Sequence, residues 1–80
     1  MTILRVTYSE DFRVSAIASK IYALLRDRGF DPFRVTLNYY AKIGEQEANF
    51  HFNNSDKLEN EKSKLEEILR KFKIKEFSLI

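Results

Sequence analysis

Residues 33–53, FRVTLNYYAKIGEQEANFHFN, contain two runs of alternating apolar and polar residues on either side of Gly44. Successive side chains of a β-strand point to opposite faces, so each alternating run predicts a half-buried strand. A short turn that contains glycine separates the two runs, as in a β-hairpin. The stretch therefore predicts a hairpin with strands at residues 33–43 and 47–53.

The sequence on both sides of this hairpin alternates between the strand period and the helix period. Residues 3–8, ILRVTY, and residues 76–80, EFSLI, alternate as half-buried strands do. In residues 13–28 and 57–72 the apolar positions recur every three or four residues, which predicts two amphipathic helices.

The ends of both predicted helices carry local signals. Gly29 can adopt the left-handed conformation that satisfies the last helical carbonyls, and Phe30 can then fold back onto the first helix. Residues 56–59, DKLE, have the spacing of a capping box at the start of the second helix. Glu66 and Arg70 have the i,i+4 spacing and order that favour an ion pair on that helix.

The resulting order, strand–helix–strand–strand–helix–strand, predicts an α+β, ferredoxin-like βαββαβ fold: a four-stranded antiparallel sheet with two helices on one face. We expect residues 1–80 to form one domain, with the side chains of Val35, Leu37, Phe50 and Phe52 beneath the helices. A domain of this size buries only about 60% of its unfolded surface, so a partner surface is expected.

The composition limits the function classes. The 80 residues include no cysteine and one histidine, and the formal net charge is +2. No run approaches the roughly 20 apolar residues of a membrane span, so we expect a cytoplasmic protein and no membrane contact. His51 lacks companion ligands and neither glycine belongs to a phosphate-binding motif. We therefore expect no catalytic residues, no metal and no cofactor.

The polar face of the sheet gives one alternative, nucleic-acid binding. RNA-recognition modules use this fold and stack bases on aromatic side chains of the uncovered sheet face. In the predicted register Phe50 and Phe52 point to the helices instead, and a shift of one residue would reverse this. The residues that would contact nucleic acid are Arg5, Arg34, Tyr40 and His51.

Residues 15–31, SAIASKIYALLRDRGFD, carry a resemblance to a known family. The spacing of Ile17, Ala18, Ile21, Leu24 and Leu25, followed by Asp-Arg-Gly-Phe at 27–30, resembles the first helix of the ACT domain, a small-ligand regulatory module of amino-acid metabolism. The arginine–glycine–aromatic ending is similar to that of the small regulatory subunits of acetolactate synthase. The order of elements resembles the family over the whole chain, whereas the specific match covers this helix and its exit.

The resemblance implies a non-catalytic regulatory domain that binds an amino acid in the turn before the first helix and acts on a catalytic partner subunit. The positions carried over are Ser9, Glu10, Asp11, Arg13, Ser15 and Ala16; Ser15 and Ala16 stand where the family usually has Pro-Gly. It also implies a homodimer through a sheet edge or the open sheet face. The small ferredoxin-like nucleases of CRISPR systems share an acidic residue after the first strand, but their glycine-arginine-valine continuation is poorly matched here.

Overall fold

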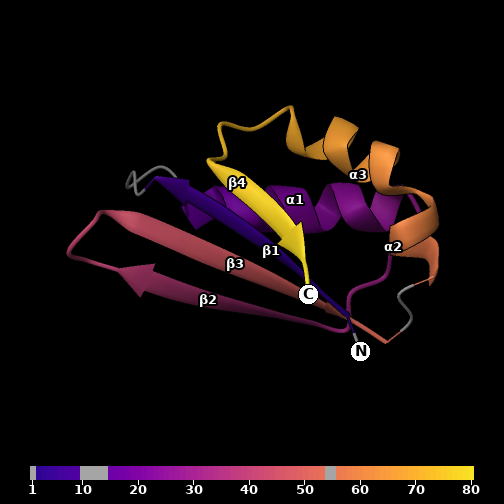
Figure 1. The fold of residues 1–80 in the computed structure, drawn as a ribbon, viewed down its shortest axis with the longest axis horizontal. Helices are drawn as coiled ribbons and strands as arrows, with labels where there is room; N and C mark the ends of the chain where they lie inside the picture. Colours follow the sequence, from indigo (N-terminus) through magenta and orange to yellow (C-terminus); the bar gives the residue numbers. More distant parts are fainter. Residues whose placement is uncertain (1, 10–14, 54–55) are drawn as a thin grey trace.

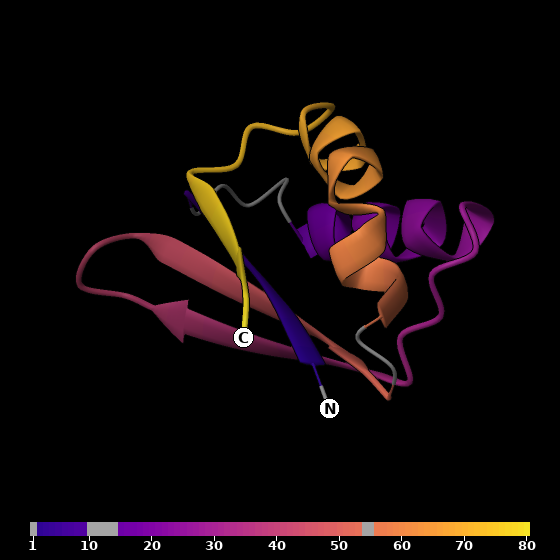
Figure 2. The ribbon, with the colours of Figure 1, turned by 45° about the vertical axis from the view of Figure 1, so that its right-hand side comes forward.

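The computed structural model of the chain describes residues 2–9, 15–53 and 56–80. Neighbouring strands pair antiparallel in the order β2-β3-β1-β4, and the helices lie on one face of this sheet (Figures 1 and 2). This confirms the predicted α+β architecture with a four-stranded antiparallel sheet. Along the chain the elements are β1 (Thr2–Ser9), α1 (Ser15–Asp27), β2 (Arg34–Tyr40), β3 (Glu45–Phe52), α2 (Asp56–Asn60), α3 (Lys62–Leu69) and β4 (Glu76–Leu79).

The hydrophobic core lies between the helices and the two central strands. Leu4 of β1 faces Phe50 of β3, and Val6 faces Ala48. Phe50 is fully buried and Phe52 is 3% exposed, so the predicted phase of β3 is confirmed. The helices contribute Ala18, Ile21, Leu25, Leu58, Leu65, Ile68 and Leu69 to this core.

The expected burial of β2 is wrong, although its phase is right. Val35 lies opposite Phe50 and Leu37 lies opposite Ala48, so both side chains are on the helix side of the sheet. However, Val35 is only partly buried and Leu37 is 52% exposed. β2 is an edge strand of the sheet, and a groove lined by Val35 and Leu37 separates it from α1. The helix layer therefore leaves much of the apolar face of β2 uncovered.

The hairpin turn comes earlier than the alternation predicts. β2 ends at Tyr40, and residues 41–44 form the turn, where the amide of Ile43 donates to the carbonyl of Tyr40 over 3.3 Å. Gly44 has a φ of +62°, a conformation that glycine adopts without strain. Ile43, expected as an inward-facing strand residue, lies in this turn and is exposed.

The predicted second helix, residues 57–72, is divided into α2 and α3 and ends at Leu69. Glu61 separates the two segments, with φ −115° and ψ 33°, outside the helical range. Residues 59–64 are all polar, so no side chain in this turn anchors it to the core. The Glu61 carboxylate instead accepts a hydrogen bond from Lys64 Nζ over 2.8 Å.

The predicted glycine end of α1 is confirmed. Gly29 has a φ of +84°, its amide donates to the carbonyl of Arg26 over 3.0 Å, and the amide of Phe30 donates to the carbonyl of Leu25 over 2.8 Å. These two bonds define a Schellman motif, and Phe30 is buried at 2% exposure. Lys57 Nζ donates to the carbonyl of Gly29 over 2.8 Å, which connects α2 to the end of α1.

We predict that Gly29→Ala lowers the free energy of unfolding by about 1–2 kcal/mol, because an L-residue is strained in the left-handed region. Urea denaturation followed by circular dichroism measures the loss. Arg28→Ala, at an exposed neighbouring position without a positive φ, is the control and should change stability by about 0.5 kcal/mol or less. Equal urea midpoints for Gly29→Ala and the unmodified chain would contradict this role of Gly29.

Candidate functional site

The amino-acid turn implied by the family resemblance falls largely on residues whose structure is not described. Ser9 is the exposed last residue of β1 and lies opposite Glu45 of β3. Glu10, Asp11 and Arg13 lie outside the described residues. Ser15 and Ala16 begin α1, and the description does not extend to their side chains.

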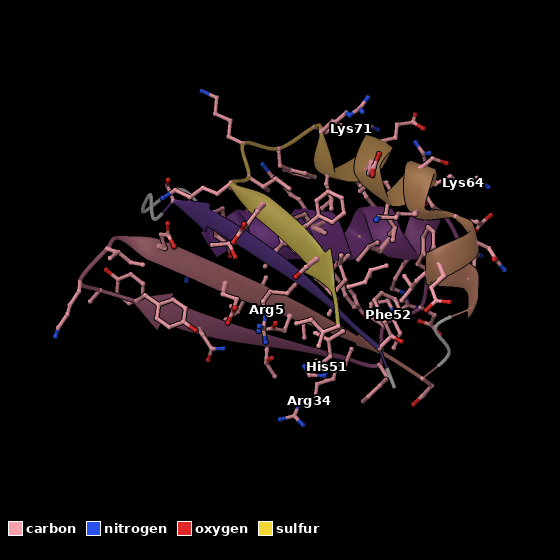
Figure 3. The ribbon with its side chains drawn as sticks, viewed as in Figure 1. Arg5, Arg34, His51, Phe52, Lys64 and Lys71 are labelled. Carbon is pink, nitrogen blue, oxygen red and sulfur yellow. The ribbon has the colours of Figure 1, made fainter. Side chains whose placement is uncertain are left out.

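The four residues of the nucleic-acid alternative lie on one face of the sheet, away from the helices. Arg34 of β2 lies directly opposite His51 of β3, and Arg5 of β1 lies opposite Asn49, two residues before His51 on the same face; Figure 3 labels Arg5, Arg34 and His51. His51 Nε2 is 3.1 Å from Thr36 Oγ1. Tyr40 lies at the far end of β2 and is 46% exposed. The register thus gathers all four positions on the open face.

A network of polar side chains centred on Glu47 occupies the middle of this open face. Glu47 Oε1 is 2.9 Å from Arg5 Nε. Glu47 Oε2 accepts hydrogen bonds from Asn38 Nδ2 over 3.0 Å, from Tyr40 OH over 3.1 Å and from Asn49 Nδ2 over 3.5 Å. Arg5 Nε also donates to Asn49 Oδ1 over 3.0 Å. The network joins β1, β2 and β3.

The neighbouring side chains cover Glu47 so well that it is 8% exposed, although no helix or strand of the described residues lies over this face in Figures 1 and 2. Burial alone would raise the pKa of the Glu47 carboxyl, but the hydrogen bonds from Asn38, Asn49 and Tyr40 and the charge of Arg5 outweigh it and lower the pKa. The pKa of Tyr40 is raised because its hydroxyl donates to the Glu47 carboxylate. Glu47 is thus held ionised.

Both oxygens of Glu47 are already engaged, which suits a structural tie better than proton transfer. Arg5, one of the residues named as nucleic-acid contacts, forms an ion pair with this carboxylate. Arg34 has no ion pair within the described part of the chain. The alternation of the sequence placed Glu47 on the polar face but gave no signal that it is buried.

The second surface with a distinct character is the free edge of the sheet at β2. One side of β2 pairs with β3, and the other side pairs with no strand of the described chain. Beside this edge a groove of about 320 Å³ separates β2 from α1. Its lining residues are Ala18, Ser19, Tyr22, Val35 and Leu37.

Comparison with known protein families and with curated proteins finds no match to this chain. Within the described residues, no group of three or more histidine, aspartate or glutamate side chains is arranged to hold a metal ion. None of the helices in that part of the chain is long and apolar enough to cross a membrane.

We predict that Glu47→Gln lowers the free energy of unfolding by about 1–3 kcal/mol at pH 7, because charge-assisted hydrogen bonds to a largely buried carboxylate are lost. The pKa of Glu47 is lower in the folded than in the unfolded protein, so this stabilisation is complete above the unfolded value of about 4.3. It is lost as the pH falls through the folded-state pKa. Urea denaturation between pH 7 and pH 2 measures the difference between the two proteins.

Glu67→Gln is the control for this pH series, because Glu67 is exposed and has no ion pair with any described residue. Its stability should follow that of the unmodified chain at every pH. A gap between Glu47→Gln and the unmodified chain that persists unchanged at pH 2 would show that charge is not the source of the effect.

Proposed function

We propose that the chain is a cytoplasmic, non-catalytic regulatory domain of the ACT type, built on the ferredoxin-like βαββαβ fold, and that it acts as a homodimer. The strand order supports this fold. β1 and β2 both run antiparallel to β3 and are therefore parallel to each other, with α1 between them in the chain. β3 and β4 are related in the same way through α2 and α3. Two interleaved units of this kind make the ferredoxin-like arrangement.

The observation that carries the proposal is the free, largely uncharged edge of β2. This strand has seven residues, RVTLNYY, and only Arg34 is charged. Proteins protect exposed edges with charges, proline or very short strands, because unpaired backbone groups recruit other strands. β2 has little of this protection, and Leu37 offers an apolar side chain beside its groove. A second copy of the same edge would pair with the unpaired backbone groups of β2 and would cover Leu37.

The sequence of β2 is complementary to itself when two copies pair antiparallel. Pairing over the full strand places its midpoint, Leu37, on the two-fold axis. Val35 of each copy then faces Tyr39 of the other on the helix side. On the open side Arg34 of each copy faces Tyr40 of the other, where a cation–π contact can form. Apolar residues thus meet apolar or aromatic ones.

A ligand bound in the segment implied by the resemblance could affect the proposed dimer through α1. The segment in which the resemblance places the ligand lies between β1 and α1 in the chain, and α1 forms one wall of the groove beside β2. An amino acid bound in that segment would favour one position of α1 over another and so bias the association of the two copies. The dimer would transmit this bias to a catalytic partner subunit.

Nucleic-acid binding is the alternative, and the contacts on the open face support it less. Phe50 and Phe52 lie beneath the helices, so they are not available for stacking on bases. Arg5 is paired with Glu47, which leaves Arg34 as the unpaired arginine of the four residues.

We predict that light scattering gives the mass of two chains at micromolar concentration, and that Leu37→Lys gives the mass of one. A lysine at this position would place two like charges against each other at the centre of the paired strands. Ile43→Lys is the matched control, because Ile43 is 64% exposed in the turn beyond the strand, and it should remain a dimer. A single-chain mass for the unmodified protein would contradict the proposal, and salt-sensitive binding of that monomer to single-stranded RNA would favour the alternative.

We predict that Leu37→Cys forms an intermolecular disulfide under mild oxidation, because directly opposed residues of antiparallel strands have Cα atoms about 4.5–5.5 Å apart, within the range of a disulfide. The natural chain has no cysteine, so a single engineered thiol reports on one position. Thr36→Cys is the control and should not cross-link, since it faces position 38 of the other copy in this register. Non-reducing gel electrophoresis measures both. Cross-linking through position 36 but not 37 would contradict the register.

A further inference from the structure

A groove of about 600 Å³ lies between α3 and β4, at the opposite edge of the sheet from β2. Its size falls within the range of small-molecule sites, about 300–1,000 Å³. Its apolar lining consists of Leu69 from α3, Phe72 and Ile74 from the connection, and Phe77 from β4. Leu69 is fully enclosed by the core, whereas the other three are only partly buried. They therefore offer apolar surface to a bound molecule.

The polar lining of the groove contains both signs of charge. Glu66 comes from α3 and Arg70 directly follows this helix, while Lys75 directly precedes β4 and Glu76 is its first residue. Lys75 Nζ is paired with the Glu45 carboxylate. Among the described residues no ion pair includes Glu66, Arg70 or Glu76. The ion pair predicted between Glu66 and Arg70 from their spacing is therefore not formed.

The groove thus combines an apolar floor with unpaired carboxylates and an unpaired guanidinium. We propose that it binds a zwitterionic molecule with a large apolar body, namely an aromatic amino acid. The ammonium of the ligand would meet Glu66 or Glu76, and its carboxylate would meet Arg70, which can bind a carboxylate through two parallel hydrogen bonds. The ring would pack against Phe72 and Phe77, as aromatic pairs do.

This inference shares the class of ligand with the proposed function but uses a different site. The groove is connected to the rest of the sheet by two contacts of Lys75. Its amide donates to the carbonyl of Thr7 in β1 over 2.8 Å, and its ammonium pairs with Glu45 at the start of β3. Glu45 lies opposite Tyr40 at the end of β2. The ion pair between Lys75 and Glu45 therefore links this groove to the end of β2, the strand that we propose as the dimer interface.

The test is a titration of the ¹⁵N-labelled full chain with L-phenylalanine, followed by NMR. We expect saturable shifts of the amides in residues 66–77. Phenethylamine, which lacks the carboxylate, and 3-phenylpropionate, which lacks the ammonium, should each bind about tenfold more weakly, because each leaves one charged group of the groove without a partner. Arg70→Gln should weaken L-phenylalanine by a similar factor and leave the affinity for phenethylamine unchanged.

Lys62→Gln is the matched control, since Lys62 is an exposed cation of α3 outside the groove, and it should not change the affinity. Phe77→Leu tests the floor with a substitution that keeps an apolar side chain, and it should weaken L-phenylalanine and both analogues together. Shifts confined to residues 9–16 would overturn this inference and support the ligand turn of the proposed function. The absence of any shift, or equal affinities for the three compounds, would overturn it without affecting the tests of the dimer.

Discussion

Two short helix segments and one longer helix must cover the apolar face of a four-stranded sheet, and they reach only part of it. α1 has thirteen residues, and a groove lined by its Ala18, Ser19 and Tyr22 separates it from the edge strand β2. β3 and β1 are central in the sheet, so their apolar side chains are buried. β2 is at the edge, and Leu37 on the same face remains half exposed. This shortfall leaves an apolar edge on the molecule.

The open face carries the interaction that compensates for this shortfall. β2 has little apolar packing to hold it, yet Asn38 and Tyr40 reach across to the carboxylate of Glu47 on β3. Arg5 connects the same carboxylate to β1. A buried carboxylate without partners would destabilise the fold, whereas one with four partners fixes three strands relative to one another. The hairpin can therefore present β2 as an ordered strand while its helix side stays uncovered.

The sequence periodicity predicted the elements and their faces, because alternation and helical spacing are local properties. The glycine end of α1 was likewise predicted from Gly29 and Phe30 alone. Alternation could not locate the hairpin turn, since Ile43 keeps the apolar parity although it lies in that turn. The helix period similarly continued across the polar residues around Glu61, where no core contact holds the turn.

The features that define the two surfaces depend on contacts between distant parts of the chain. Glu47 is a polar residue in an alternating strand, and only the approach of Arg5, more than forty positions away, shows that it is buried. The exposure of Leu37 depends on how far the helices reach, which no pattern within β2 encodes. The i,i+4 spacing of Glu66 and Arg70 favoured an ion pair, but both residues line a groove that exists only once α3 and β4 are placed together.

The two edge strands of the sheet, β2 and β4, differ in length and charge, and this difference suits them to different binding partners. β4 has four residues and begins beside the charged side chains of Lys75 and Glu76, so it gives a second strand little length to pair with. β2 is nearly twice as long and almost uncharged, which suits a strand of the same kind. The groove between α3 and β4, which has charged side chains around an apolar floor, instead suits a small molecule that carries both charges and an apolar body. Because Lys75 connects the groove to Glu45, which directly follows the hairpin turn, occupation of one edge has a physical route to the other.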